Sequence, residues 1–164
     1  MRLLPYRRIT LRSPLSASAV VQLLENSVEP KRRFRFGSGA RRFEGTVTGL
    51  VFDIQPILFY RNSFVPQIRG TIEPEPTGSR ISLVMRPHLA VLVFMSAWLS
   101  SIFAGGVTFA IAAFRGCAGI GPTLIPFAMF LFGWMLTVGG FSSEATRAEQ
   151  YLISMVRGIR EPSV

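Results

Sequence analysis

Two long runs without a charged residue constrain this chain more than any other feature of its sequence. Residues 89–114 and residues 122–141 contain no Asp, Glu, Lys or Arg. A hydrocarbon core of about 30 Å is crossed by about 20 helical residues, so both runs are long enough to span a bilayer. The sequence therefore predicts two transmembrane helices. The alternatives are a buried helix of a soluble protein for the first run and a re-entrant loop for the second.

The segment between the two runs, residues 115–121, is short and rich in Gly. Such a segment is typical of a tight turn between antiparallel helices, which places both ends of the hairpin on one side of the membrane. Basic residues beside the spans favour the cytoplasmic side. Arginines at 80, 86, 147 and 157 flank the two runs, whereas the connector holds Arg115 alone. We expect both termini in the cytoplasm.

Positive charge is concentrated before the first apolar run. Of the 18 basic residues, 14 precede residue 89, and the chain as a whole carries a formal charge of +9. A strongly basic segment indicates anionic partners such as lipid headgroups or nucleic acid. Three arginines near the start (Arg7, Arg8 and Arg12) interrupt the apolar stretch that a cleavable secretory signal requires. We therefore expect the first span to serve as the insertion signal.

Residues 1–88 read as a small cytoplasmic α+β domain. Ser13 followed by Pro14 predicts the start of a helix, because a capping hydroxyl and a proline in the first turn both suit that position. Beyond residue 40, short runs rich in Val, Ile, Phe and Thr alternate with Gly and Pro. This pattern predicts an antiparallel sheet of four or five strands, with the helix packed against it.

Residues 142–164 follow the second apolar run and repeat small and apolar side chains at helical spacing. Ser142 or Ser143 is a candidate cap, so the sequence predicts a separate amphipathic helix and tail. That helix either docks on the soluble domain or lies along the bilayer. Docking is favoured, because its acidic and basic residues balance and give anionic lipid no net attraction. The predicted fold is a membrane α-helical hairpin (89–141) with a small cytoplasmic α+β domain (1–88) and this C-terminal helix.

One group of short motifs is familiar. F-E-G-T-V at 43–47, F-D-I at 52–54 and Y-R-N-S-F-V-P-Q-I-R-G at 60–70 occur in that order before the hairpin. In these motifs the chain resembles small bacterial membrane proteins of unknown function, which carry a cytoplasmic sheet domain ahead of a two-helix membrane hairpin. The resemblance covers about residues 40–141. It implies a bacterial inner-membrane location and no particular activity.

The densest basic feature gives the first candidate binding site. It consists of Lys31, Arg32, Arg33, Arg35, Arg41 and Arg42. Contact with anionic lipid headgroups is one interpretation. Nucleic acid is another, since Phe34 and Phe36 are interleaved with the arginines, but attachment to a membrane makes it unlikely. A solvated strand face is the structural alternative. Arg61 and Asn62 form a second candidate, for an anion or a partner, although Asn62-Ser63 is also ordinary turn chemistry.

Small residues mark one face of each apolar run. They are Ala97, Ser101, Gly105 and Thr108 in the first run, and Gly133, Thr137 and Gly140 in the second. Such faces allow two helices to approach closely in lipid. We expect them to pack the two spans against each other, and oligomerisation through one of the faces is the alternative.

No catalytic residue, cofactor site or metal site is predicted. The chain has one His, His88, and one Cys, Cys117, whereas a zinc site needs about four ligands. No base is placed to activate a serine. The predicted function is a membrane-anchored interaction or assembly module without enzymatic activity, which binds lipid and a protein partner or its own copies. The alternatives are a module that responds to anionic lipid and a subunit of an oligomeric transporter or pore.

Overall fold

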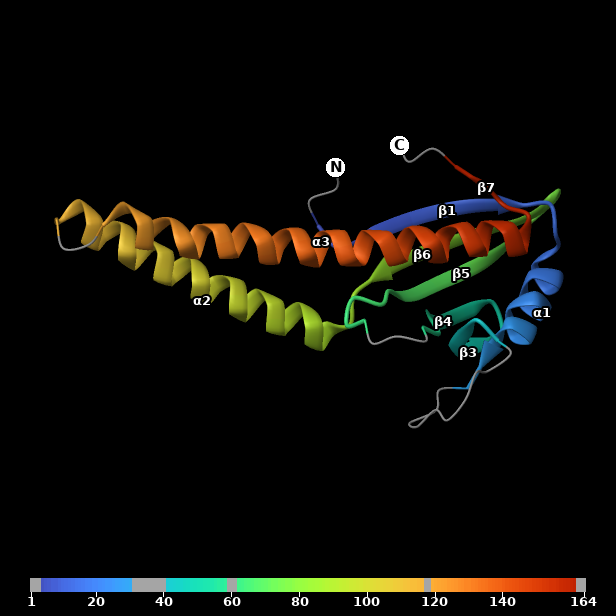
Figure 1. Cartoon of the computed structure of the whole chain (residues 1–164). Helices are drawn as coiled ribbons and strands as arrows, with labels where there is room; N and C mark the ends of the chain where they lie inside the picture. Colours follow the sequence, from blue (N-terminus) through green and yellow to red (C-terminus); the bar gives the residue numbers. More distant parts are fainter. Residues whose placement is uncertain (1–3, 31–40, 59–61, 117–118, 162–164) are drawn as a thin grey trace.

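The computed structural model describes residues 4–30, 41–58, 62–116 and 119–161. An elongated molecule results, with a helical hairpin at one end and a sheet domain at the other (Figure 1). In chain order the elements are β1 (Arg7–Ser13), α1 (Ala17–Ser27), β2 (Val28–Glu29), β3 (Phe43–Thr48), β4 (Val51–Pro56), β5 (Gln67–Glu75), β6 (Gly78–Arg86), α2 (Leu89–Phe114), α3 (Ile120–Val156) and β7 (Ile159–Arg160).

The sheet is mixed and has seven strands in the described residues, in the order β2-β3-β4-β5-β6-β1-β7. Every neighbouring pair is antiparallel except β2 and β3, which are parallel. The prediction of an antiparallel sheet was therefore right for most of the sheet and too small in strand number. Gly49 takes a φ of +57° between β3 and β4, a conformation that favours glycine in a tight turn.

Three strands were not predicted from the sequence: β1 and the two-residue strands β2 and β7. The longest of them is β1. Its residues alternate, so Ile9 and Leu11 are buried while Arg8 and Arg12 point to solvent. It lies between β6 and β7. Because the strand continues to Ser13, the predicted helix start at Ser13-Pro14 is wrong. The cap of α1 is Ser16, whose hydroxyl accepts a hydrogen bond from the Ala19 amide.

Helix α3 is continuous for 37 residues, from the tip of the hairpin into the sheet domain. The predicted break at Ser142 is wrong. The hydroxyl of Ser143 donates to the carbonyl of Gly140, and that of Thr146 donates to the carbonyl of Ser142. Hydroxyl groups can bond within a helix in this way as well as cap it, so a Ser-Ser pair does not oblige the helix to start afresh.

One core fills the sheet domain. It lies between the inner face of the sheet, α1 and the last part of α3. The α3 residues in this core are Phe141, Ala145, Ala148, Leu152 and Val156. The C-terminal segment is therefore docked on the sheet, as favoured from the sequence. From α1, Val20 and Leu24 are buried in it.

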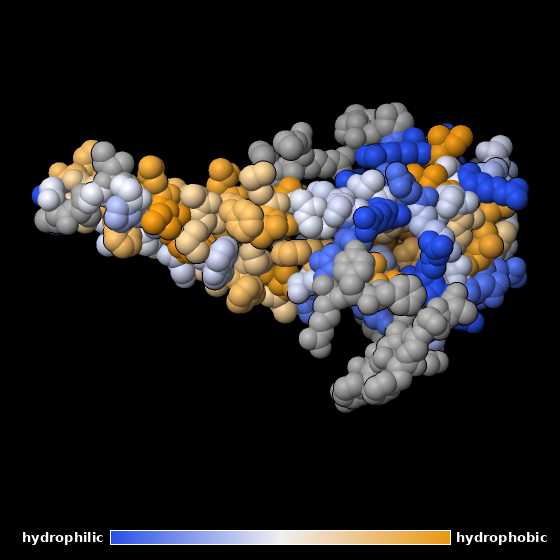
Figure 2. Space-filling view, in the orientation of Figure 1, coloured by the Kyte–Doolittle hydropathy of each residue, from blue (hydrophilic) through white to orange (hydrophobic). Residues whose placement is uncertain are grey.

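The hairpin presents a different surface. Helix α2 and the first part of α3 are both long and apolar enough to cross a membrane. Large apolar side chains point outward along them, with Phe94 65%, Phe132 64% and Phe114 95% exposed. Figure 2 shows hydrophobic residues over the hairpin and hydrophilic residues gathered over the sheet domain. Both ends of the hairpin meet the sheet domain, as expected for two antiparallel helices joined by a short connector.

Candidate functional site

One face of the sheet has no helix packed on it within the residues that the structure describes. Helices α1 and α3 cover the other face, where the alternating apolar residues of β1, β4, β5 and β6 are buried. We call the uncovered side the open face and define it by Arg8, Thr10, Arg12, Val51, Asp53, Arg69, Thr71, Glu73, Arg80, Ser82, Val84 and Arg86. Its side chains are mostly polar and partly or fully exposed.

Charges on the open face are paired at the end far from the hairpin. The guanidinium of Arg12 lies 2.7 Å from Glu161 and 3.5 Å from Glu75. Arg80 lies 2.9 Å from Glu75, so these four residues form one network. Exposed ion pairs stabilise a fold only slightly. Their main effect here is to leave little net charge at this end of the open face.

The end of the open face nearest the hairpin has the opposite character. Arg8 and Arg69 are both opposite Val84 in the strand register, and Arg86 is two residues along β6. Arg69 is 2.8 Å from Asp53. Within the described part of the chain, Arg8 and Arg86 have no acidic partner. A net positive charge therefore remains around Val84, close to where the chain enters α2.

The surface around Val84 is hollowed. A cavity of about 670 Å³ lies over β1, β5 and β6 and is bordered by Tyr6 and Val51. It has arginine donors at its edge and threonine and serine hydroxyls across its floor, from Thr10, Thr71 and Ser82. Arginine and tyrosine beside a shallow polar surface are typical of protein interfaces.

A second cavity, of about 490 Å³, lies where β3 meets α3. We call it the basic pocket and define it by Arg41, Arg42, Arg147 and Tyr151. The Arg42 guanidinium lies 4.8 Å from the centre of the Tyr151 ring, a cation–π contact. Arg147 is 3.5 Å from Glu144. Arg41 donates to the backbone carbonyls of Glu25 and Val28, so part of its hydrogen-bonding capacity is used within the fold.

The predicted basic site is thus only partly described. Arg41 and Arg42 lie in the basic pocket, and the structure adds Arg147 from far along the chain. Lys31, Arg32, Arg33 and Arg35 lie outside the described residues, and so does Arg61.

Asn62 is described and bonds within the chain. Its amide nitrogen donates to the carboxylate of Glu144 over 3.3 Å, and its oxygen accepts from the Phe64 amide over 2.9 Å. The second of these bonds is the local turn contact expected of Asn. Asn62 therefore ties the segment before β5 to α3.

The two faces of small residues have different positions. On α3, a Cβ added at Gly133 would lie 2.4 Å from the Trp98 ring, and one added at Gly140 would lie 3.0 Å from Phe64. Thr137 is buried between them and its hydroxyl donates to the Gly133 carbonyl. Gly133 thus packs against α2, whereas Gly140 packs against Phe64 from the segment before β5.

The α2 face does not pack against α3. Ala97, Ser101 and Thr108 are exposed, and nothing lies within 4 Å of a Cβ added at Gly105. Gly106 makes the contact with α3 instead, against Phe127 and Pro126. The predicted face is on the side of α2 turned away from the hairpin seam, so the expected packing of the two spans through both small faces is wrong for α2.

Other candidates for chemistry are sparse. Among the residues that the structure describes, no group of three or more His, Cys, Asp or Glu side chains is close enough to hold a metal ion. His88 caps α2, with its ring nitrogen accepting from the Ala90 amide. Cys117 lies outside the described residues.

Sequence analysis missed the arginines of the open face. Arg8 was used only to exclude a secretory signal and Arg86 only to orient the first span, because β1 was not recognised as a strand beside β6. The alternation of Ile9 and Leu11 with polar residues was the available signal. This alternating segment is short and contains three arginines, so residues 7–13 were not expected to form a strand.

No protein-family model, curated protein or solved structure matches this chain. The open face, the basic pocket and the apolar hairpin are the features that bear on function.

Proposed function

We propose that this protein is a membrane-anchored interaction module without catalytic activity. In this proposal the hairpin of α2 and the first part of α3 crosses the cell inner membrane, and the sheet domain lies at the cytoplasmic surface. The exposed phenyl rings of the hairpin support the first part, because apolar surface of this extent is unfavourable in water. The distribution of arginines, dense in the sheet domain and single in the connector, supports the second part.

The observation that carries the proposal is the continuity of α3. The same helix forms one leg of the hairpin and, through Phe141, Leu152 and Val156, part of the sheet-domain core. At 1.5 Å per residue its 37 residues extend for about 55 Å. No flexible linker separates the two parts along this path. The hairpin therefore holds the open face at a fixed height and angle, as an anchored binding surface requires.

The partner that best fits the open face is a protein with an acidic patch. The unpaired arginines Arg8 and Arg86 would meet carboxylates, and the hydroxyls around Val84 would supply further hydrogen bonds. The mixed polar character of the remaining face suits a reversible contact more than a permanent one. A second copy of this chain is a weaker fit, because two open faces would bring like charges together.

Site-specific cross-linking in intact cells tests this proposal. A photoreactive amino acid at Thr71, on the open face, should yield an adduct of one defined mass, whereas one at Gln22, on the exposed side of α1, should not. The double substitution Arg8→Gln and Arg86→Gln should remove the adduct. Its control is Ser18→Glu with Gln22→Glu, which changes the net charge equally on the opposite side of the sheet. Equal adducts from both probe positions, or loss of the adduct in the control, would contradict the proposal.

A second candidate function is favoured by the basic pocket, which gathers Arg41, Arg42 and Arg147 at the side of α3. In this candidate the domain responds to anionic headgroups through these arginines. The full chain is required for its test, because residues 1–88 alone lack the α3 side chains that complete the core. Reconstituted protein should change the fluorescence of a dye attached beside the pocket when anionic lipid is added, and high salt should reverse the change. A response unaffected by Arg42→Gln with Arg147→Gln would exclude it.

A further inference from the structure

A cluster of two arginines and one glutamate lies at the base of the hairpin, on a different side of α3 from the basic pocket. Arg7 lies 2.6 Å from one carboxylate oxygen of Glu149, and Arg160 lies 2.9 Å from the other. Arg7 also donates to the hydroxyl of Thr146 over 3.1 Å. The Glu149 side chain is only 7% exposed. Three elements, β1, α3 and β7, therefore meet at one carboxylate.

The cluster keeps one positive charge. A single carboxylate stands between two guanidinium groups, and both its oxygens are occupied. Arginine has five N–H donors. Within the described residues, the hydrogen bonds of Arg7 and of Arg160 are all donated by a single nitrogen, Nη1. Glu149 thus holds the two guanidinium groups in place while leaving donors on each for a further anion.

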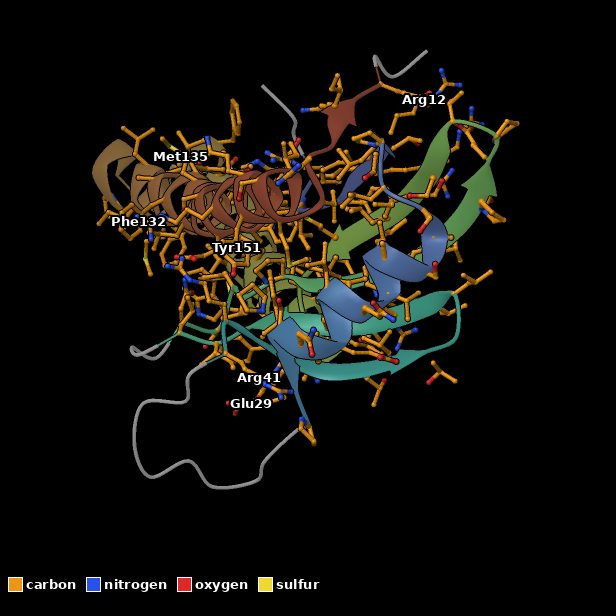
Figure 3. All side chains as sticks on the ribbon, turned by 90° about the vertical axis from the view of Figure 1, so that its right-hand side faces the viewer. Arg12, Glu29, Arg41, Phe132, Met135 and Tyr151 are labelled. Atoms are coloured by element: carbon orange, nitrogen blue, oxygen red, sulfur yellow. The ribbon has the colours of Figure 1, made fainter. Side chains whose placement is uncertain are left out.

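An apolar groove leads away from this cluster along α3. Its volume is about 1040 Å³, and it is lined at the hairpin end by Leu131, Trp134, Met135, Val138 and Gly139, and at the other by the arginine cluster. The lining residues follow one side of the helix at intervals of three to four, as helical geometry requires. From Leu131 to Glu149 the groove extends for about 27 Å. Figure 3 shows Met135 and Tyr151 on opposite sides of α3, so the groove and the basic pocket are separate.

The cluster extends from the end of the apolar hairpin into the sheet domain, since Arg160 is opposite Leu11, four residues along β1 from Arg7. Arg7 is opposite Met85 in the sheet register, shortly before α2 begins at Leu89. The apolar end of the groove is continuous with exposed hairpin surface, where Leu131 is 59% and Met135 63% exposed. A ligand in this groove would have one long apolar part beside the hairpin and one anionic end beside the sheet domain.

We propose that the groove binds a single anionic phospholipid, with an acyl chain along α3 and the headgroup phosphate at Arg7 and Arg160. The charge at one end and the apolar lining at the other match such a molecule. Guanidinium groups bind phosphate oxygens through paired N–H donors. Gly139 keeps the middle of the groove open, because nothing lies within 4 Å of a Cβ added there. The inference depends on the proposed membrane location of the hairpin and goes beyond it by assigning a specific lipid site.

Fluorescence quenching by brominated lipid tests the inference. Trp134 lines the groove, and Trp98→Phe leaves it as the one tryptophan of the chain. The full chain is placed in nanodiscs of fixed phosphatidylglycerol and phosphatidylcholine content, in which only one of the two lipids is brominated. Brominated phosphatidylglycerol should quench Trp134 more strongly than brominated phosphatidylcholine at equal mole fraction. Arg7→Gln with Arg160→Gln should abolish this preference, since loss of one charge-assisted hydrogen bond lowers affinity roughly tenfold.

Two controls make the result specific. Arg12→Gln with Arg80→Gln changes the net charge equally at the far end of the open face, outside both proposed lipid sites, and should leave the preference intact. Gly139→Leu should fill the groove and reduce the preference for phosphatidylglycerol while leaving both arginines in place. It therefore tests the groove independently, even if the double arginine variant folds poorly. Gly105→Leu, at a glycine of α2 that also has open space beside it, should have no effect.

The outcomes separate the two proposals. The lipid site would be overturned, and the membrane location kept, by either of two results. One is equal quenching by both lipids in the unsubstituted groove. The other is a preference that survives both Gly139→Leu and the double arginine substitution. Absence of quenching by either lipid would overturn the membrane location itself, and the lipid site with it.

Discussion

The two halves of α3 have the same backbone conformation and opposite side-chain arrangements. In the hairpin half the small residues Gly133 and Thr137 face inward, and the large Leu131, Phe132 and Met135 face outward. In the domain half the large and small apolar residues are both inside, and Arg147 and Gln150 are exposed.

The difference shows that the surroundings, more than helix propensity, decide the pattern along this helix. Burial in water favours apolar residues inside and polar residues outside. Against lipid no such preference operates, and close packing by small residues takes its place. The proposed membrane location accounts for this change of pattern, because α3 would pass from lipid to water near Phe141.

The largest test of this comparison removes a phenyl ring from each half. Phe141→Ala should lower the free energy of unfolding by about 3–5 kcal/mol, because the ring is 2% exposed and its loss leaves a cavity in the sheet-domain core. Phe132→Ala makes the same chemical change where the ring is 64% exposed, and should leave the unfolding of the sheet domain nearly unchanged. Denaturant unfolding in mild detergent measures both. Equal losses of unfolding free energy would contradict the difference in burial between the two halves of α3.

A charge introduced on the hairpin tests directly whether the hairpin lies in lipid. Phe132→Arg should reduce membrane insertion, because an arginine near the centre of a span costs roughly 2.5–3.5 kcal/mol on insertion scales. Gln150→Arg, on the exposed side of the domain half, should have no effect on insertion. The fraction of protein retained in membranes after alkaline extraction is the measurement. Retention of both variants at the same level would count against a spanning hairpin.

Two glycines sharpen the comparison within the hairpin, with effects of opposite sign. Gly133→Ala should destabilise by about 1–3 kcal/mol, because its new methyl group would overlap the Trp98 ring. Gly105→Ala meets open space and should stabilise its helix by roughly 0.5–1 kcal/mol. Thermal unfolding in detergent distinguishes them. Destabilisation by both would show that the outer side of α2 is also a packed surface.

The smallest expected effect concerns the open face. Arg69→Ala removes the pair with Asp53 and should cost roughly 0.2–1 kcal/mol, because both groups are partly exposed to solvent. Added salt should shrink the difference between the variant and the parent. A salt-independent loss would indicate that Arg69 contributes through packing of its apolar stem instead.

Sequence analysis found the hairpin because twenty or more uncharged residues are a signal that needs no tertiary context. It found β3 to β6 from their alternation, but not β1, where the repeating Arg of R-R-I-T-L-R-S obscured the apolar Ile9 and Leu11. The start of α1 was wrong for the same reason, since Ser13 belongs to the strand and donates its hydroxyl to the carbonyl of Val156.

The candidate sites were harder to predict than the fold. Arg7 and Arg160 are separated by almost the whole chain, and only the neighbouring positions of β1 and β7 bring both to Glu149. Arg42 and Tyr151 similarly come together through β3 and α3. Local periodicity carries no information about such pairs. The cluster of basic residues was visible in the sequence. The basic pocket was not, because it also needs Arg147 from α3, and that part of α3 was expected to be a separate helix.

The position of α3 after the strands β1 to β6 sets the order in which the sheet domain is completed during synthesis. The strands from β1 to β6 leave the ribosome before residues 141–156, yet those residues cover their inner face. Until they arrive, Phe52, Ile68 and Leu83 lack their final cover, and such surface favours aggregation. In the proposed membrane location, the sheet therefore stays incomplete until the hairpin has been made and inserted, and the domain matures after its anchor.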